Sequence, residues 1–208
     1  MALAKSMIGL AVLVALSLSG GVHATDAEVG AVERRLVSPD ADGNVVGWAG
    51  LGPFFNTYDV KGSSCGVDSS PRIDETSVTV VDGGREAPAI ETNDSEANLE
   101  LFTWRTVRDC GTLACAPGSK GLDLECHFGR KAKPAVLAYA GATIVSNKAQ
   151  DALIEFGADD GYIMWLNGKR VSHSEGNCPA CAVNAQTGAF EYSARVQLKA
   201  GENVLLFK

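Results

Sequence analysis

A strict alternation of apolar and polar residues between positions 190 and 199 constrains the fold more than any other feature of this sequence. The apolar members are Phe190, Tyr192, Ala194, Val196 and Leu198, and the polar members are Glu191, Ser193, Arg195, Gln197 and Lys199. Because successive side chains of a β-strand point to opposite faces, this period predicts an antiparallel strand with one face buried and the other in water.

The residues before this strand predict a β-hairpin. Residues 153–156 and 162–166 are expected strands separated by the turn Asp159-Asp160-Gly161, and Asn167-Gly168 follows them. Asn and Gly both tolerate the positive φ that a two-residue type I′ turn requires. Residues 204–207 follow a turn at 201–203 and are apolar on both faces, so we expect them in the centre of a sheet.

Other segments complete an all-β pattern. Further strands are expected at residues 45–55, 77–81, 99–107 and 135–145, and a short helix at residues 27–36. About eight strands, expected to be joined by hairpins, with almost no helix predict an antiparallel β-sandwich or jelly roll with disulfide-stapled loops.

The first 24 residues have the features of a secretory signal peptide. Lys5 is a positive residue before an uncharged apolar run at residues 7–18, and Val22 and Ala24 are small residues at the positions that a signal peptidase recognises. The run is shorter than the roughly 20 residues that span a bilayer. We therefore expect a secreted, extracytoplasmic protein, with cleavage after Ala24, a lead-in at residues 25–44 and one β-sandwich domain at residues 45–208.

The net charge indicates which classes of partner are excluded, and the cysteine content indicates the redox compartment. The formal net charge of −7 argues against nucleic acid and anionic membrane surfaces. An even number of cysteines in an exported chain predicts disulfides, and six cysteines allow 15 pairings. The six are Cys65, Cys110, Cys115, Cys126, Cys178 and Cys181. Our hypothesis joins Cys178 to Cys181 and leaves the other four to pair among themselves.

Four stretches together resemble the galactose-binding-like β-sandwich modules of secreted bacterial proteins, which are related to carbohydrate-binding modules. These stretches are Trp48 with Gly52-Pro53-Phe54, residues 138–150, residues 157–168 and residues 198–208. A looser similarity, in the Asp-Asp-Gly turn before a strand and hairpin, connects the chain with PA14 domains. The resemblance implies a β-sandwich that accompanies a catalytic domain, and the chain ends directly after an apolar strand, so we expect a domain truncated at Lys208 or one module of a longer protein.

The same resemblance implies the candidate ligand residues. In PA14-type adhesins the pair matching Asp159 and Asp160 binds a calcium ion that bridges to a sugar, which suits carboxylate ligands. The alternative is that both aspartates only shape the turn. Trp104 and Trp165 are candidate stacking platforms for sugar rings, with core packing as the alternative. His173 stands where the family has a His near an Arg, although the following loop differs here.

Redox, zinc and catalytic chemistry have weaker signals. Cys178 and Cys181 have the spacing of a redox or zinc motif, but no helix of an α/β fold is expected there and export favours a disulfide. No nucleophile elbow or metalloprotease helix motif occurs in the sequence. We therefore expect no catalytic residue, no cofactor other than candidate calcium, and a non-catalytic accessory module that binds carbohydrate. The alternatives are a structural or protein-interaction domain without sugar binding, and the first part of an exported hydrolase.

The signal-peptide hypothesis predicts a mature chain that begins at Thr25, because Ala24 and Val22 offer the small side chains that the peptidase pocket accepts. Mass spectrometry of the protein secreted by a bacterial host measures this directly. A secreted chain that still begins at Met1 would contradict the hypothesis.

Overall fold

The structure is a computed structural model that describes part of the chain in atomic detail. The described residues are 45, 47–55, 67, 69–81, 84, 86, 102–107, 122, 124–128, 136–158, 161–174 and 190–208, together with the backbone of 13–17 and 36–37. Among them the strands are β1 (Leu13–Ser17), β2 (Leu36–Val37), β3 (Ala49–Phe55), β4 (Arg105–Thr106), β5 (Val136–Ser146), β6 (Gln150–Gly157), β7 (Tyr162–Leu166), β8 (Lys169–Ser174), β9 (Tyr192–Leu198) and β10 (Gly201–Phe207). One short helix, α1 (Leu124–Phe128), accompanies them, so the expected all-β class is confirmed.

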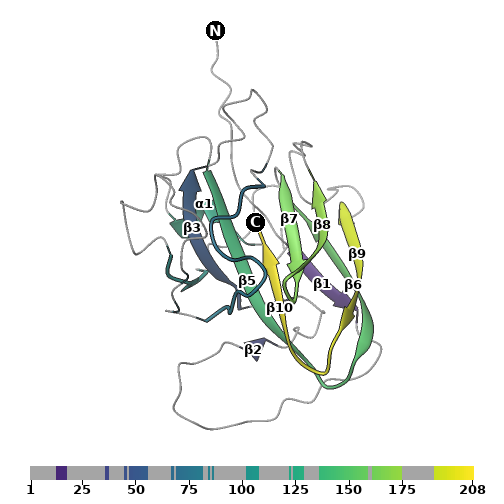
Figure 1. Cartoon of the computed structure of the whole chain (residues 1–208). Helices are drawn as coiled ribbons and strands as arrows, with labels where there is room; N and C mark the ends of the chain where they lie inside the picture. The colour runs from purple at the N-terminus through teal and green to yellow at the C-terminus, as the bar shows by residue number, and fades with distance from the viewer. Residues whose placement is uncertain are drawn as a thin grey trace.

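The strands form two sheets that lie as two layers (Figure 1). Sheet A has the order β1-β6-β9, and sheet B has the order β4-β3-β5-β10-β7-β8 with β2 beside β5. All pairs are antiparallel except β2 with β5. The alternating segment identified in the sequence is β9, and residues 204–207 lie in β10, which pairs with β5 on one side and β7 on the other.

The chain passes repeatedly from one sheet to the other. β5, β7, β8 and β10 belong to sheet B, whereas β6 and β9 belong to sheet A. The expectation that hairpins join most strands is therefore wrong for this region, because most of these turns cross between layers. β7–β8 is the exception: Asn167 and Gly168 have φ values of 52° and 75°, as the sequence predicted for the turn.

A first hydrophobic core fills the space between the sheets. Ile154, Phe156 and Leu198 from sheet A pack with residues of the facing side of sheet B. Phe207 is central, since its ring has edge contacts with Trp48 and Phe156 at centroid distances of 5.9 and 5.1 Å. Aromatic pairs in this geometry add to the stabilisation that burial provides.

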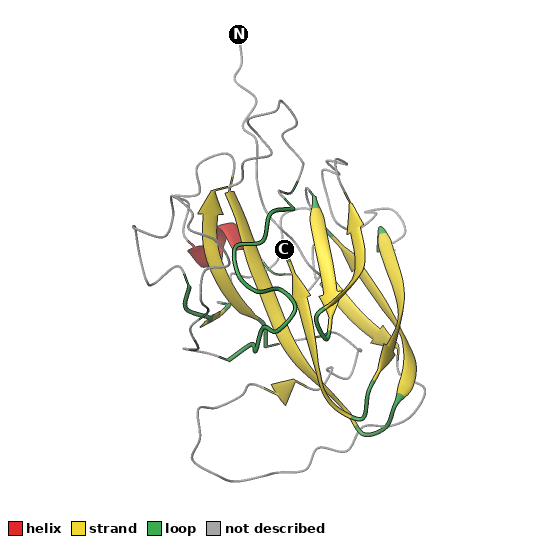
Figure 2. Ribbon diagram, in the orientation of Figure 1, coloured by secondary structure: helices red, strands yellow, loops and turns green. Residues whose placement is uncertain are grey.

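A second hydrophobic core lies on the opposite face of sheet B. Leu51, Ile163 and Leu206 pack there against a covering segment, defined here as residues 69–81. Figure 2 shows this segment as the green loop that crosses in front of β5 and β10. The central strands of sheet B are therefore buried on both faces, whereas β8 has exposed residues.

Two strand predictions fail in this second core. Residues 77–81 are irregular although Val78 and Val80 are buried, and of the expected strand at 99–107 the described residues 102–107 contain only the short strand Arg105–Thr106. The apolar alternation reflects burial against sheet B, and the backbone of the covering segment runs over the sheet face where no strand edge is available for pairing.

Two strands precede residue 45. β1 lies within the segment expected to be a leader, and its Cα partners are residues 153–157 of β6, so cleavage after Ala24 would remove β1 and leave β6 and β9 as the described strands of sheet A. β2 includes Leu36, the last residue of the expected helix, so that position is extended. The rest of the expected helix lies outside the described residues.

Buried polar side chains fix the covering segment to sheet B. The Lys208 side chain is fully buried, and its ammonium donates to Glu75 Oε1 at 3.1 Å and to the Ser70 carbonyl at 2.6 Å. The Tyr139 hydroxyl donates to the same Glu75 oxygen at 2.6 Å and accepts the backbone N–H of Arg72 at 3.0 Å. These bonds join a turn, β5 and the end of β10.

Replacement of Glu75 by Ala is expected to destabilise the protein by about 3 kcal/mol, because it leaves the Lys208 ammonium buried without its carboxylate. Urea denaturation followed by tryptophan fluorescence measures the change. The matched control is the exposed Lys148→Ala, which should alter the unfolding free energy by less than about 0.5 kcal/mol. An unchanged unfolding midpoint for Glu75→Ala would contradict this role for the cluster.

Candidate functional site

The proposed calcium ligands lie outside the described residues. Asp159 and Asp160 follow Ala158 at the end of β6, and the next described residue is Gly161 before β7. Within the described part of the chain, no group of three His, Cys, Asp or Glu side chains could hold a metal ion. The calcium hypothesis therefore stays a prediction.

Both candidate tryptophans have buried rings. Trp104 is 0% exposed in the second core, and its indole N–H donates to Glu86 Oε1 at 2.7 Å. Trp165 is 6% exposed and lies in the same core. Stacking of a sugar on either ring would require the residues that cover it to move.

His173 is exposed on β8, on the face of sheet B that bears the second core. Its Cα partner is Ile163, a member of that core. Directly opposed residues of an antiparallel pair share a face of the sheet. The structure nevertheless does not bring His173 together with Trp104, because β8 is at one end of sheet B and Trp104 directly precedes β4 at the other end.

Five of the six predicted disulfide cysteines lie outside the described residues: Cys65, Cys110, Cys115, Cys178 and Cys181. Cys126 lies in α1, where only the backbone is described at that position. The hypothesis for the disulfide pairing therefore stays a prediction.

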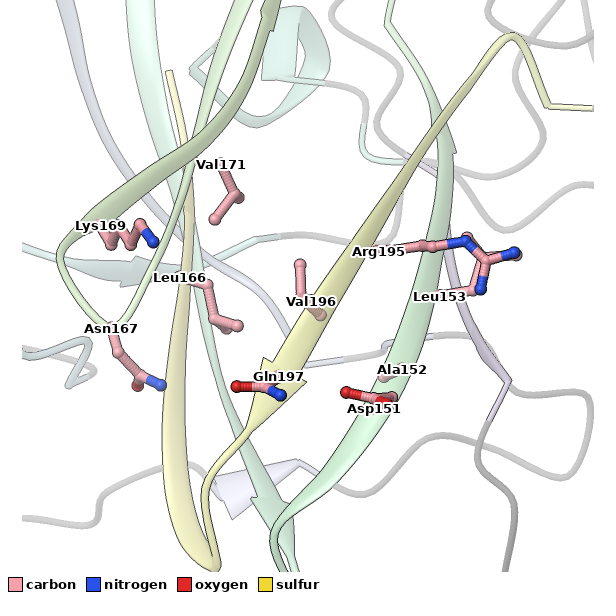
Figure 3. Close-up of a pocket in the computed structure, with 10 residues that line it drawn as sticks. All are labelled: Asp151, Ala152, Leu153, Leu166, Asn167, Lys169, Val171, Arg195, Val196 and Gln197. Carbon is pink, nitrogen blue, oxygen red and sulfur yellow. The ribbon is translucent and has the colours of Figure 1, made fainter.

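A pocket of about 800 Å³ lies where the edges of the two sheets diverge (Figure 3). β8 is the last strand of sheet B and β9 the last strand of sheet A, and the pocket lies between them. Its described lining residues are Asp151, Ala152, Leu153, Leu166, Asn167, Lys169, Val171, Arg195, Val196 and Gln197.

One wall of the pocket is the β7–β8 hairpin. Asn167 is held rigidly: its side chain accepts the Val204 N–H at 3.0 Å and donates to Asn203 Oδ1 at 3.0 Å. Lys169 is the Cα partner of Leu166, a first-core residue, so both lie on the face of sheet B that is turned toward sheet A. Figure 3 shows the Lys169 ammonium extending into the pocket.

The other wall comes from sheet A. Asp151 on β6 and Gln197 on β9 are direct cross-strand partners, and both are exposed. Opposed Cβ atoms in such pairs are about 5 Å apart, so the carboxylate and the amide form one polar surface. Both lie on the face of sheet A turned away from the first core, since the next cross-strand pair, Ala152 and Val196, faces that core (Figure 3).

Aliphatic side chains form the floor between these walls. Ala152, Leu166 and Val196 are buried members of the first core, and Val171 packs against it. β8 has one residue more than β7 here, since the register shifts between Met164 and Trp165. The pocket lining thus combines apolar side chains with an ammonium, a guanidinium, a carboxylate and two amides.

Shifted pKa values occur at other places in the described chain. Burial raises the pKa of Tyr139 well above its usual range, and the neighbouring Glu75 carboxylate adds to this effect. Burial also raises the pKa of Tyr162, whose hydroxyl lies 2.9 Å from Ser172 Oγ. Hydrogen bonds from Ser77 and Thr76 lower the pKa of Asp74. These groups are structural donors and acceptors in the fold.

The pocket residues were not among the sequence-predicted site residues. Gln197 and Asp151 stand on polar strand faces, which the alternation assigns to water, and Lys169 follows a turn. Nothing in the sequence indicates that the ends of the two sheets lie side by side. The Glu75, Tyr139 and Lys208 cluster was missed for the same reason, since its members are 64 and 133 residues apart.

Comparisons with family models, curated proteins and solved structures found no match to this chain. Among the described residues, no helix is long and apolar enough to cross a membrane. The geometry of the pocket is therefore the basis for proposing a function.

Glu86 gives a pH-dependent prediction for the second core. Burial raises the pKa of its carboxyl group, against the hydrogen bond from Trp104, so the folded state favours the protonated form. Its stabilising contribution is present below the ordinary pKa of 4.5 and is lost as the pH rises through the higher pKa of the folded state. Glu86→Gln should therefore be more stable than the wild type at pH 7 and equal to it at pH 3.5.

Urea denaturation at both pH values measures this difference. Asp74→Asn is the matched opposite, because hydrogen bonding lowers the pKa of Asp74; that variant should lose stability at pH 7. A Glu86→Gln variant less stable than the wild type at pH 7 would show that the charged carboxylate is favoured in the core.

Proposed function

We propose that the chain is an exported, non-catalytic module that binds carbohydrate in the pocket between β8 and β9. The observation on which this rests is the combination, in one pocket, of an apolar lining with polar side chains from both sheets. Ligand sites of proteins commonly have an apolar lining with a small number of placed polar groups.

The polar groups suit a polyhydroxylated ligand. Gln197 offers both donors and an acceptor, and Asp151 offers acceptors only, so the pair can bond to neighbouring hydroxyls that both donate and accept. The aliphatic floor can contact the C–H face of a sugar ring. In place of the stacking tryptophan proposed from the sequence, the half-buried Val171 offers this apolar contact, since Leu166 and Val196 are as deeply buried as Trp165.

The sequence is the basis for proposing export and an accessory role. The apolar run at residues 7–18 supports a secreted location, and the resemblance to galactose-binding-like modules supports a sugar ligand and a neighbouring domain as partner. A ligand role for Asp159 and Asp160 with calcium belongs to the same proposal. These aspartates follow the end of β6, whereas the pocket contains the start of that strand, so calcium there would form a separate site.

A glycan array probed with the full chain, with and without calcium, tests the function. Binding in the presence of a chelator is expected, because the pocket needs no metal ion. Gln197→Ala and Asp151→Ala should each weaken binding by about tenfold, since each removes a hydrogen-bonding partner. Ser193→Ala, on the same exposed face of β9 but outside the pocket, should not change it.

Two other outcomes would assign the protein another binding site or another function. Binding that a chelator abolishes would favour Asp159 and Asp160 as the site. Absence of binding across a broad array, from a protein shown to be folded by circular dichroism, would contradict the carbohydrate proposal and favour a structural module.

A further inference from the structure

We infer that β6 accepts a β-strand from a partner protein, along the edge that β1 occupies in the structure. The inference goes beyond the carbohydrate proposal and uses a different surface from the pocket. It rests on the proposed cleavage after Ala24, which would remove β1 from sheet A.

The pairing of β1 shows that this edge of β6 has the geometry of a strand acceptor. Figure 1 shows β1 beside β6, where residues 13–17 and 153–157 are Cα partners in antiparallel register. β9 pairs with the other side of β6 along residues 150–156. Once β1 is removed, the described strands of sheet A leave one edge of β6 without a neighbouring strand.

The sequence of β6 does not protect this edge against pairing. Exposed edges of sheets commonly carry a proline, a β-bulge or a charged side chain that points inward. β6 contains no proline, and its register with β9 runs without a shift. Its inward residues are Ala152, Ile154 and Phe156, all members of the first core. The edge therefore has the regular row of backbone N–H and C=O groups to which an added strand binds.

The other edges of the two sheets are less suitable. β4, at one end of sheet B, is only two residues long. β8, at the other end, has a register shift against β7 and bears Lys169 on the face turned toward sheet A. The second edge of sheet A belongs to β9, which lies next to β8. Among the described strands, β6 is therefore the edge best suited to accept a partner.

The two faces of β6 define the residues that the partner strand needs. Ile154 and Phe156 are completely buried, so the residues directly opposite them should be apolar, because opposed residues share a face of the sheet. Glu155 lies on the other face and is half-buried. A Lys or Arg directly opposite Glu155 would stabilise the pair, whereas a Glu would destabilise it. The favoured partner strand thus alternates apolar and polar residues and has a basic residue opposite Glu155.

A second copy of this chain fits the edge less well. Antiparallel pairing of two β6 strands centred on Leu153 would place Asp151 of each copy opposite Glu155 of the other, and directly opposed like charges destabilise a sheet. Pairing centred on Ile154 would place Leu153 opposite Glu155. Neither register provides a cation for the Glu155 carboxylate, so a different protein with a basic residue in its strand is the better occupant.

Fluorescence anisotropy with a labelled peptide of residues 11–19, which includes β1, tests the inference on the secreted chain that begins at Thr25. We expect binding, and Ala15→Lys in the peptide should strengthen it about threefold, since residue 15 is the Cα partner of Glu155. Ala15→Glu should weaken it about threefold. A peptide with Ala15→Pro and Leu16→Pro should bind about tenfold more weakly, because alternate residues of a strand donate to a given neighbour and proline has no N–H.

Two variants of the protein locate the bound peptide. Glu155→Lys should reverse the charge preference, so that the Ala15→Glu peptide binds more tightly than the Ala15→Lys peptide. Glu191→Lys is the matched control: it changes the net charge equally, but Glu191 precedes β9 and is not opposite the added strand. That variant should still prefer the Ala15→Lys peptide.

The unprocessed chain separates this inference from the proposed cleavage. In the chain of residues 1–208, the tethered β1 competes for the same edge, so the peptide should bind about tenfold more weakly than to the secreted chain. Ala15→Pro with Leu16→Pro in this unprocessed chain should restore binding. A secreted chain that begins at Met1 would contradict the cleavage alone, since the two unprocessed chains still report on β6.

Three results would overturn the inference. Absence of peptide binding by the secreted chain and by the proline variant of the unprocessed chain, both folded by circular dichroism, would show that β6 accepts no strand. An equal change of the charge preference in Glu155→Lys and Glu191→Lys would place the peptide away from β6. A dimer detected by light scattering that the peptide dissociates would make a second copy of the chain the occupant.

Discussion

Burial of both faces of sheet B is the constraint on which the rest of the structure depends. In β10, Leu205 and Phe207 face the first core, and Leu206 faces the second. Transfer of such side chains from water stabilises a fold by roughly 1.5–3 kcal/mol each, so each face requires a cover. Sheet A covers one face, and the covering segment of residues 69–81 covers the other. The pocket exists because sheet A covers its face only as far as β9.

Fully satisfied polar groups hold these covers in register. Asn203 is completely buried, and its amide bonds to Lys199, Gly201 and Asn167, so one side chain ties the β9–β10 turn to the β7–β8 hairpin. That hairpin bears Lys169, and β9 bears Gln197. The two walls of the pocket are therefore connected through a single buried amide, which gives the proposed ligand site a rigid frame. On the second face, Glu75 and Lys208 have the corresponding role for the covering segment.

The candidate site differs in kind from the one that the sequence suggested. The sequence directs attention to aromatic residues and to paired aspartates, which are the residue types most often found in sugar and calcium sites. In the structure Trp104 and Trp165 contribute to the second core, and the pocket is lined by aliphatic side chains together with an ammonium, a guanidinium, a carboxylate and two amides. Recognition of a sugar by this arrangement would depend on hydrogen bonds and charge, with ring stacking replaced by aliphatic contact.

Local patterns in the sequence determined the fold class, the β9 alternation, the central position of β10 and the Asn167-Gly168 turn, because period and turn chemistry depend only on neighbouring residues. These local patterns did not predict that Val78 and Val80 are buried without forming a strand, since an irregular segment packed on a sheet shows the same alternation as a strand. The ion pair between Glu75 and the buried Lys208, and the polar lining of the pocket, depend on which segments become neighbours. Only the tertiary structure decided that, because the polar face of a strand has the same sequence whether it meets water or lines a pocket.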